Sequence, residues 1–106
     1  MLAICAVSVA ALGGQIAAAS GAGAKTVTLR NIAFSPKKLS VSRGTTVSFR
    51  WHDDTTTHNV TSTGTKRFKT ISNRSTGVQS RRFARAGVYR YACTLHPGMT
   101  GQITVR

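Results

Sequence analysis

Between residues 25 and 106 the hydrophobic residues come in short alternating runs that are separated by turn-forming residues. Val47, Phe49 and Trp51 occupy every second position, with Thr, Ser and Arg beside them. The same alternation recurs in segments 27–29, 39–41, 88–93 and 102–106. A period of two is typical of β-strands that bury one face. The pattern therefore predicts a sheet protein, and no segment favours a long helix.

The spacing of these runs indicates how the strands pack. Turn residues recur every eight to twelve positions, as between strands of a sandwich. We expect seven to eight short strands, one of them near 58–63, in an all-β, Greek-key β-sandwich. Residues 64–80 contain few large apolar side chains. We interpret this segment as a long, partly irregular crossover.

The first 24 residues carry no charged side chain. An apolar run over residues 1–12 is broken by Gly13 and Gly14, and small residues follow it. This is the pattern of a secretory signal peptide, so we expect residues 1–24 to be removed and residues 25–106 to form one domain. The usual basic opening segment is absent from the sequence, and we expect the true start to lie upstream. The alternative is an uncleaved membrane anchor.

Residues 25–106 contain a single cysteine, and the expected export makes this residue informative. Cys93 has no partner for a disulfide within that domain. A lone exposed thiol is a liability in the oxidising periplasm, cell envelope or extracellular space where we expect the protein to reside. Cys93 therefore needs another role. A small buried hydrophobic residue is the simplest alternative.

The segment that follows Cys93 supplies that role. Cys93, His96 and Met99 lie in one short connection between two predicted strands, and His58 opens another strand. A thiolate, two imidazoles and a thioether form the ligand set of a trigonal copper site with a weak axial methionine. Soft sulfur ligands favour copper(I), and a geometry that suits both oxidation states eases electron transfer. An ordinary core methionine is the alternative for Met99.

Four segments together make the sequence recognisable: Asn-Ile-Ala-Phe-Ser-Pro at 31–36, the strand 44–51, His-Asn-Val at 58–60, and the run 87–99 with its Cys-x₂-His-x₂-Met spacing. They resemble the small cupredoxins, that is plastocyanin, pseudoazurin and, by loop length, amicyanin. The resemblance implies one type 1 copper ion bound by His58, Cys93, His96 and Met99.

The resemblance also implies roles for residues around the ligands. The backbone N–H of Asn59 would donate to the Cys93 sulfur, and its side chain would bind Thr94. The edge of His96 would reach the surface and pass the electron. Plant plastocyanin has a tyrosine before the ligand cysteine and an acidic docking patch, whereas this chain has Ala92 and a basic surface. The identity of the plastocyanin partner therefore cannot be transferred to this chain.

The net charge of +13 comes from 15 Lys and Arg against two acidic residues, Asp53 and Asp54. Such a field favours an anionic partner and disfavours self-association. We expect an acidic redox protein as partner and a monomer, with membrane association only through residues 1–24. Nucleic acid is disfavoured, because the strands do not interleave aromatic with basic residues. Two basic clusters are the candidate docking patches: Arg81, Arg82 and Arg85, and Lys66, Arg67 and Lys69.

The remaining polar and aromatic candidates have structural interpretations. We expect His52 to be a solvated surface residue and Asp53 and Asp54 to stabilise a turn before His58. Tyr89 and Tyr91 are expected in the core, with one hydroxyl bound by backbone at a corner.

Three functions fit the sequence. The leading hypothesis is an exported one-electron carrier, because a fully protein-ligated metal leaves no position for substrate. Copper storage or delivery would use the same ligands. The third hypothesis is a cationic binding module with a structural metal site. An enzyme is disfavoured, because only His52 remains to build a second copper site.

Overall fold

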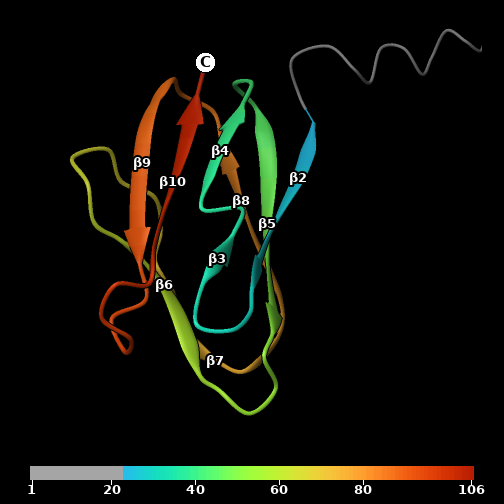
Figure 1. Cartoon of the computed structure of the whole chain (residues 1–106). Coiled ribbons are helices and arrows are strands. Elements are labelled where there is room, and N and C mark those ends of the chain that lie inside the picture. The colour runs from blue at the N-terminus through green and yellow to red at the C-terminus, as the bar shows by residue number, and fades with distance from the viewer. Residues whose placement is uncertain (1–22) are drawn as a thin grey trace, which may run out of the picture.

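The computed structural model describes residues 23–106, which contain nine β-strands and no helix. One sheet has the order β4-β10-β9-β6-β7 and the other β3-β2-β5-β8, as Figure 1 shows. The strand bounds are β2 Ala24–Leu29, β3 Phe34–Ser35, β4 Lys38–Val41, β5 Thr45–His52, β6 His58–Ser62, β7 Ile71–Arg74, β8 Thr76–Phe83, β9 Gly87–Ala92 and β10 Thr100–Val105. The prediction of an all-β sandwich is confirmed.

The predicted signal peptide or anchor lies almost entirely outside the described residues. Within residues 23–106, the chain has no helix of the length and apolarity that crossing a membrane requires.

The chain passes repeatedly between the two sheets. β2 pairs with β5 and β4 with β10 in parallel, and the other pairs are antiparallel. Parallel neighbours need a crossover connection, and between β2 and β5 the chain makes one by passing through β4 of the other sheet. These crossovers bring distant segments of the chain side by side.

The core forms where the inner faces of the sheets meet, and β5 illustrates why. Its residues Val47, Phe49 and Trp51 are buried while the residues between them are partly or fully exposed, as the alternation predicts. Each large apolar side chain buried in this way contributes about 1.5–3 kcal/mol. Phe49 packs edge-on against Tyr91 of the facing sheet, with the ring centroids 5.5 Å apart. The core therefore ties β5 to β9, the strand that leads into Cys93.

The Tyr89 hydroxyl donates to the backbone oxygen of Arg85 at 2.9 Å, four residues earlier. The expected corner hydroxyl is thus confirmed, and both tyrosines are buried.

The interpretation of residues 64–80 as an irregular crossover was wrong for its second half. β7 and β8 begin there, and β8 pairs with β5 over eight residues from Thr45 to His52. Together with the two-residue strand β3, these two strands bring the count to nine. β8 is an edge strand whose side chains are mostly exposed, so it needs no apolar alternation.

The connections that carry the candidate ligands meet at one end of the sandwich. β5 ends there, β6 begins there with His58, and β9 ends there before Cys93. In Figure 1 this end is at the bottom, opposite the C-terminus. The indole N–H of Trp51 donates to the backbone oxygen of His58 at 3.0 Å and fixes the start of β6 against β5.

Candidate metal centre

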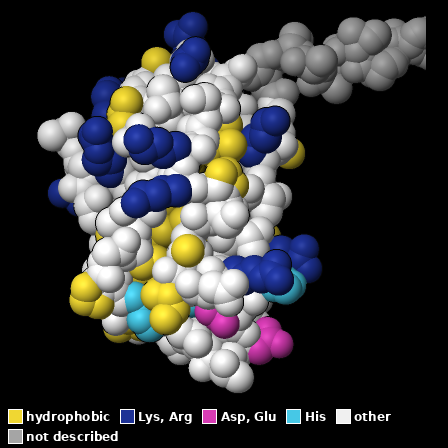
Figure 2. Space-filling view, viewed as in Figure 1, with side chains coloured by type: hydrophobic (Ala, Val, Ile, Leu, Met, Phe, Trp, Pro, Cys, Tyr) yellow, Lys and Arg dark blue, Asp and Glu magenta, His cyan; other side chains and the backbone are white. Residues whose placement is uncertain are grey.

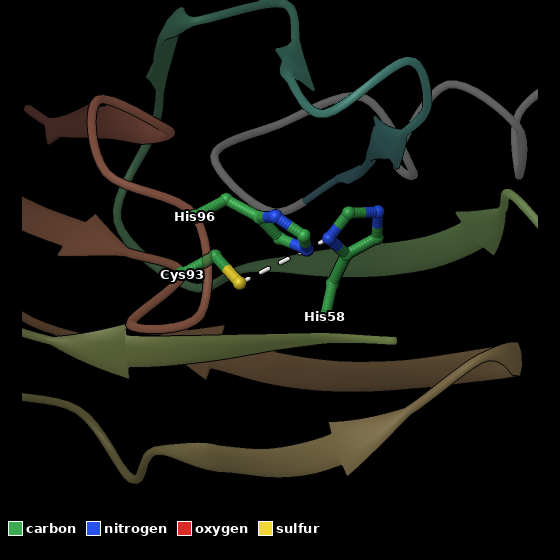
Figure 3. A group of neighbouring side chains, drawn as sticks. All are labelled: His58, Cys93 and His96. Atoms are coloured by element: carbon green, nitrogen blue, oxygen red, sulfur yellow. Dashed lines mark hydrogen bonds between the residues drawn. The ribbon is translucent and has the colours of Figure 1, made fainter. Parts of the chain in front are cut away.

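Three side chains from two distant parts of the chain converge at this end. The ligand atoms of His58, Cys93 and His96 lie within 4.8 Å of one another. The Cys93 sulfur is 3.9 Å from Nδ1 of His58, and the two imidazole centroids are 4.9 Å apart. Figure 3 shows the three side chains pointing toward a common centre. The structure thus brings together three of the four residues singled out by sequence around one point.

The connection between β9 and β10 forms a compact turn that positions its ligands. The Cys93 N–H donates to the Met99 oxygen at 2.9 Å, and the Met99 N–H donates to the His96 oxygen at 3.0 Å. Gly98 adopts a φ of 87°, which a residue without a Cβ tolerates best. Met99 is buried, 3% exposed, at the end of this turn. These backbone hydrogen bonds close the loop and bring the backbones of Cys93, His96 and Met99 close together.

Both imidazoles are held by their outer nitrogens. Nε2 of His58 lies 3.2 Å from Oδ2 of Asp53, and Nε2 of His96 lies 3.1 Å from the backbone oxygen of Thr57. A carbonyl or carboxylate oxygen accepts a hydrogen, so in a neutral ring Nε2 carries the proton. The lone pair then belongs to Nδ1. Partners of this kind fix the tautomer and orientation of metal-binding histidines.

A buried asparagine links the two ligand segments. The Asn59 N–H donates to the Cys93 sulfur at 3.5 Å, and its side-chain NH₂ donates to the Thr94 hydroxyl at 2.8 Å. Its side-chain oxygen accepts from the Thr94 N–H at 3.1 Å and from the Thr61 hydroxyl at 2.8 Å. The structure has both contacts that the resemblance implied for this residue, and adds others.

A further partner of Asn59 comes from the neighbouring strand. Its NH₂ also donates to Oδ1 of Asn73 at 3.0 Å. The pairing of β6 with β7 shifts register between His58 and Val60. Such irregularities are common beside functional sites, where they redirect side chains. All four hydrogen-bonding positions of the Asn59 amide are therefore used.

The ligands differ in exposure. His58 and Cys93 are buried, at 0% and 3% exposed, whereas His96 is only partly buried. Leu95, directly before it, is 45% exposed. His96 is therefore the side chain through which the centre meets solvent. His52 is exposed, as expected for a surface residue.

Sequence reasoning missed part of the support around the ligands. Asp53 was expected to stabilise a turn, and its backbone oxygen does accept a hydrogen bond from the Thr56 N–H at 2.9 Å. Its carboxylate also holds His58. A carboxylate five residues before a candidate ligand was the available signal, but loop geometry decides whether the two meet. Thr57 acts through its backbone, which no side-chain pattern reveals.

The family model of the cupredoxin-like domain matches residues 3–105. The chain therefore belongs to the cupredoxin-like family, and the resemblance read from its motifs is confirmed. Among curated protein sequences, no relative matches this chain.

Solved structures share the fold. A purple cupredoxin from Nitrosopumilus maritimus is 25% identical, with a TM-score of 0.69, covering 77% of this chain and 99% of that one. A single-site variant of amicyanin in its reduced Cu(I) form is 26% identical, with a TM-score of 0.70, covering 78% and 82%. A copper-containing nitrite reductase from Thermus scotoductus is 26% identical, with a TM-score of 0.68, but the match covers 76% of this chain and only 22% of the enzyme.

The donor set, the family and these copper-containing neighbours together assign the cofactor. One soft thiolate, two imidazoles and a thioether suit type 1 copper. The chain is a cupredoxin with a type 1 copper site.

Proposed function

We propose that this protein is a one-electron carrier whose copper is bound by His58, Cys93, His96 and, more weakly, Met99. The observation that carries the proposal is the convergence of three ligand atoms within 4.8 Å from β6 and the β9–β10 connection. The ligands are held by the protein fold rather than by a flexible segment.

Rigidity is what connects this geometry to electron transfer. Asp53 and Thr57 hold the outer nitrogens of the two imidazoles, and Asn59 donates to the Cys93 sulfur. Copper(I) and copper(II) prefer different geometries, so a fixed intermediate arrangement limits the rearrangement that accompanies each electron. The hydrogen bond to sulfur also tunes the reduction potential.

His96 is the proposed point of electron entry and exit. It is the most exposed of the three clustered ligands, and Leu95 presents an apolar surface next to it. A partner that covers this end would contact the imidazole edge directly. His58 and Cys93 are shielded from such contact.

Reversible redox cycling tests the proposal. The copper-loaded protein should be reduced by ascorbate and reoxidised by ferricyanide over many cycles, without loss of metal. Its electron self-exchange, followed by NMR line broadening, should be fast. Copper that cannot be cycled, or that leaves the protein on reduction, would contradict the carrier function.

Copper storage or delivery is the alternative function. The rate of copper transfer, compared with the rate of electron self-exchange, distinguishes it from the carrier function. Delivery requires the ligands to release the ion readily, and the hydrogen bonds that hold both imidazoles oppose release. For a carrier, copper transfer to a competing chelator should be much slower than self-exchange. The reverse order of rates would favour delivery.

We also propose that the domain works as an exported monomer, without catalytic activity of its own, and exchanges electrons with an acidic partner. The thiol of Cys93 is buried, which protects it from oxidants in such a location. The two basic clusters of the sequence lie close together, since Arg81 donates to the Lys69 oxygen at 2.8 Å. Arg82 pairs with Thr46, near the start of β5, whereas the metal centre lies at the other end of this strand. We expect these clusters to steer the partner over long range rather than to cover His96.

A further inference from the structure

A shallow basin lies on the five-stranded sheet, beside the ligand loop but separate from the metal centre. Its volume is about 250 Å³, smaller than a typical pocket for a drug-sized molecule. Its wall consists of three basic residues, three neutral polar residues, a tyrosine and a glycine, and contains no acidic residue: Lys37, Lys38, Arg90, Thr63, Thr100, Gln102, Tyr91 and Gly101. The size and lining suit a single small polar group.

Strand register places two of the cations on either side of an amide. Gln102 of β10 pairs with Lys38 of β4 on one side and with Arg90 of β9 on the other. The three residues form one row across the sheet, and Lys38 and Arg90 stand two strand spacings apart, roughly 10 Å. A small anion above Gln102 would lie between the two positive charges.

These charges have no counter-charge nearby in the protein. The sequence contains only two acidic residues, Asp53 and Asp54. Asp53 lies against His58, and among residues 23–106 no Lys or Arg side chain forms a salt bridge. Lys37, Lys38 and Arg90 therefore repel one another without internal compensation. A bound anion would relieve that repulsion.

The wall of the basin also covers an unpartnered donor. The Tyr91 hydroxyl is the only buried side-chain polar atom without a hydrogen bond in the described part of the chain. It lies against Gly101, where an added Cβ would be 2.7 Å from the hydroxyl oxygen. The Tyr91 side chain lies on the core face of the sheet, opposite Arg90 and Gln102, so this hydroxyl stands behind the wall rather than in the basin.

We propose that this basin binds an oxyanion group, held by Lys38 and Arg90 across Gln102 with Lys37 at the rim. Figure 2 shows Lys and Arg side chains gathered over the part of this face where Figure 1 draws β4, β9 and β10. Among them, the basin is the place where two cations flank one amide across the sheet. Free phosphate, sulfate and a carboxylate share the required chemistry.

Residues of the basin adjoin copper ligands in the sequence, so a bound anion would act electrostatically on the metal centre. Thr100 directly follows Met99, and Arg90 and Tyr91 precede Cys93 on β9. A negative charge here would stabilise copper(II) and lower the reduction potential. This coupling rests on the proposed function, whereas anion binding itself does not.

NMR titration of the purified protein with inorganic phosphate tests the binding. The reduced, diamagnetic form is titrated at constant ionic strength, with chloride replaced by phosphate, and parallel titrations use sulfate and acetate. We expect saturable shifts of the Gly101 and Gln102 amides with at least one of the three anions. The anion that saturates at the lowest concentration identifies the preferred source of the oxyanion.

Charge-matched variants make the test specific. Lys38→Gln and Arg90→Gln should each weaken binding at least fivefold. Lys25→Gln and Arg82→Gln remove the same charge from the other sheet and should change the affinity less than twofold. Non-saturable shifts with all three anions, or equal losses in all four variants, would overturn the proposal, because both indicate a diffuse ion atmosphere.

This design distinguishes a failure of the proposed anion binding from a failure of the proposed electron-carrier function. Saturable binding with a copper site that does not cycle would leave the oxyanion site standing and remove only the coupling. If the copper cycles and the anion binds, the midpoint potential should fall on phosphate addition in the wild type and change less in Arg90→Gln. An unchanged wild-type potential would overturn the coupling.

Discussion

Asp53 is the one acidic side chain in contact with a copper ligand. Its carboxylate lies 3.2 Å from Nε2 of His58, and its side chain is 21% exposed. A negative charge at this position favours the more positive oxidation state of the metal. The residue therefore acts on the copper through the imidazole rather than by touching the ion.

Replacing Asp53 by Asn retains an acceptor but removes the charge. We expect the midpoint potential to rise by tens of millivolts, on the order of 1 kcal/mol for one electron. Asp54→Asn is the matched control, because Asp54 is exposed and has no recorded contact with a ligand. Protein-film voltammetry measures both. Equal shifts in the two variants would mean that Asp53 acts only through the overall charge.

Asn59 makes five hydrogen bonds, counting its backbone N–H, and three of them join it to Cys93 and Thr94 of the other ligand segment. Asn59→Ala removes four of these bonds at a site only 5% exposed, so we expect the apoprotein to lose about 2–3 kcal/mol of unfolding free energy. Asn73→Ala removes only one of them from an exposed residue and should cost less than about 1 kcal/mol. Urea denaturation compares the two. Similar losses would argue against a central role for Asn59.

The sequence predicts the parts of the site that depend on side-chain type. It does not predict the contacts that depend on how separate segments fold together. His58, Cys93, His96 and Met99 carry side chains whose types and spacing specify copper chemistry before any fold is known. The contacts of Asp53 and Thr57 depend on how one loop curves toward His58 and His96. Asn73 reaches Asn59 because the pairing of β6 and β7 shifts register. Such details arise only when separate elements meet.

Among the elements, strands with one buried face were predictable and the outer edge strand was not. β5 alternates because its inner residues form the core. Of the eight residues of β8, only Phe83 is buried, so the sequence of this strand has no period to read. β7 likewise buries only Ile71. Pairing with a neighbour, rather than an apolar face, makes these segments strands.

β9 and β10 fit together because a glycine lies opposite a tyrosine. Gly101 pairs with Tyr91, and a Cβ on Gly101 would lie 2.4 Å from the tyrosine ring. Gly101→Ala should therefore destabilise the protein by about 1–3 kcal/mol, through overpacking of the core. At Gly64 the nearest atom would be 3.5 Å from an added Cβ, so Gly64→Ala should cost less. Thermal unfolding of both variants checks this, and a fully stable Gly101→Ala protein would contradict the packing.

The whole molecule has an uneven charge distribution. In Figure 2 most of the Lys and Arg side chains gather over the upper part of the visible face, whereas the acidic side chains lie at the lower end, near histidines and one further basic group. An acidic partner would be attracted over a distance, and the protein's own copies would repel each other. The rate of electron transfer to an acidic partner should accordingly fall steeply as salt is added.

Stability at alkaline pH should depend on Tyr91. Burial raises its pKa above the ordinary value of about 10, so the folded protein keeps a proton that the unfolded chain releases. Its contribution is complete below about pH 10 and is lost as the pH rises further, by about 1.4 kcal/mol per pH unit. Tyr91→Phe should lack this loss. Urea denaturation of both proteins between about pH 9 and 11 measures it, and parallel pH profiles would contradict the assignment.

The central claim is that one ion is bound by a thiolate and two imidazoles from separate segments of the chain. Titration of the metal-free domain with copper(II), followed by visible absorption, tests it most directly. One equivalent should produce the intense absorption of a copper–thiolate bond, and Cys93→Ser should abolish it while remaining folded. Wild-type protein that stays colourless, or a Cys93→Ser protein with the same absorption, would contradict the account.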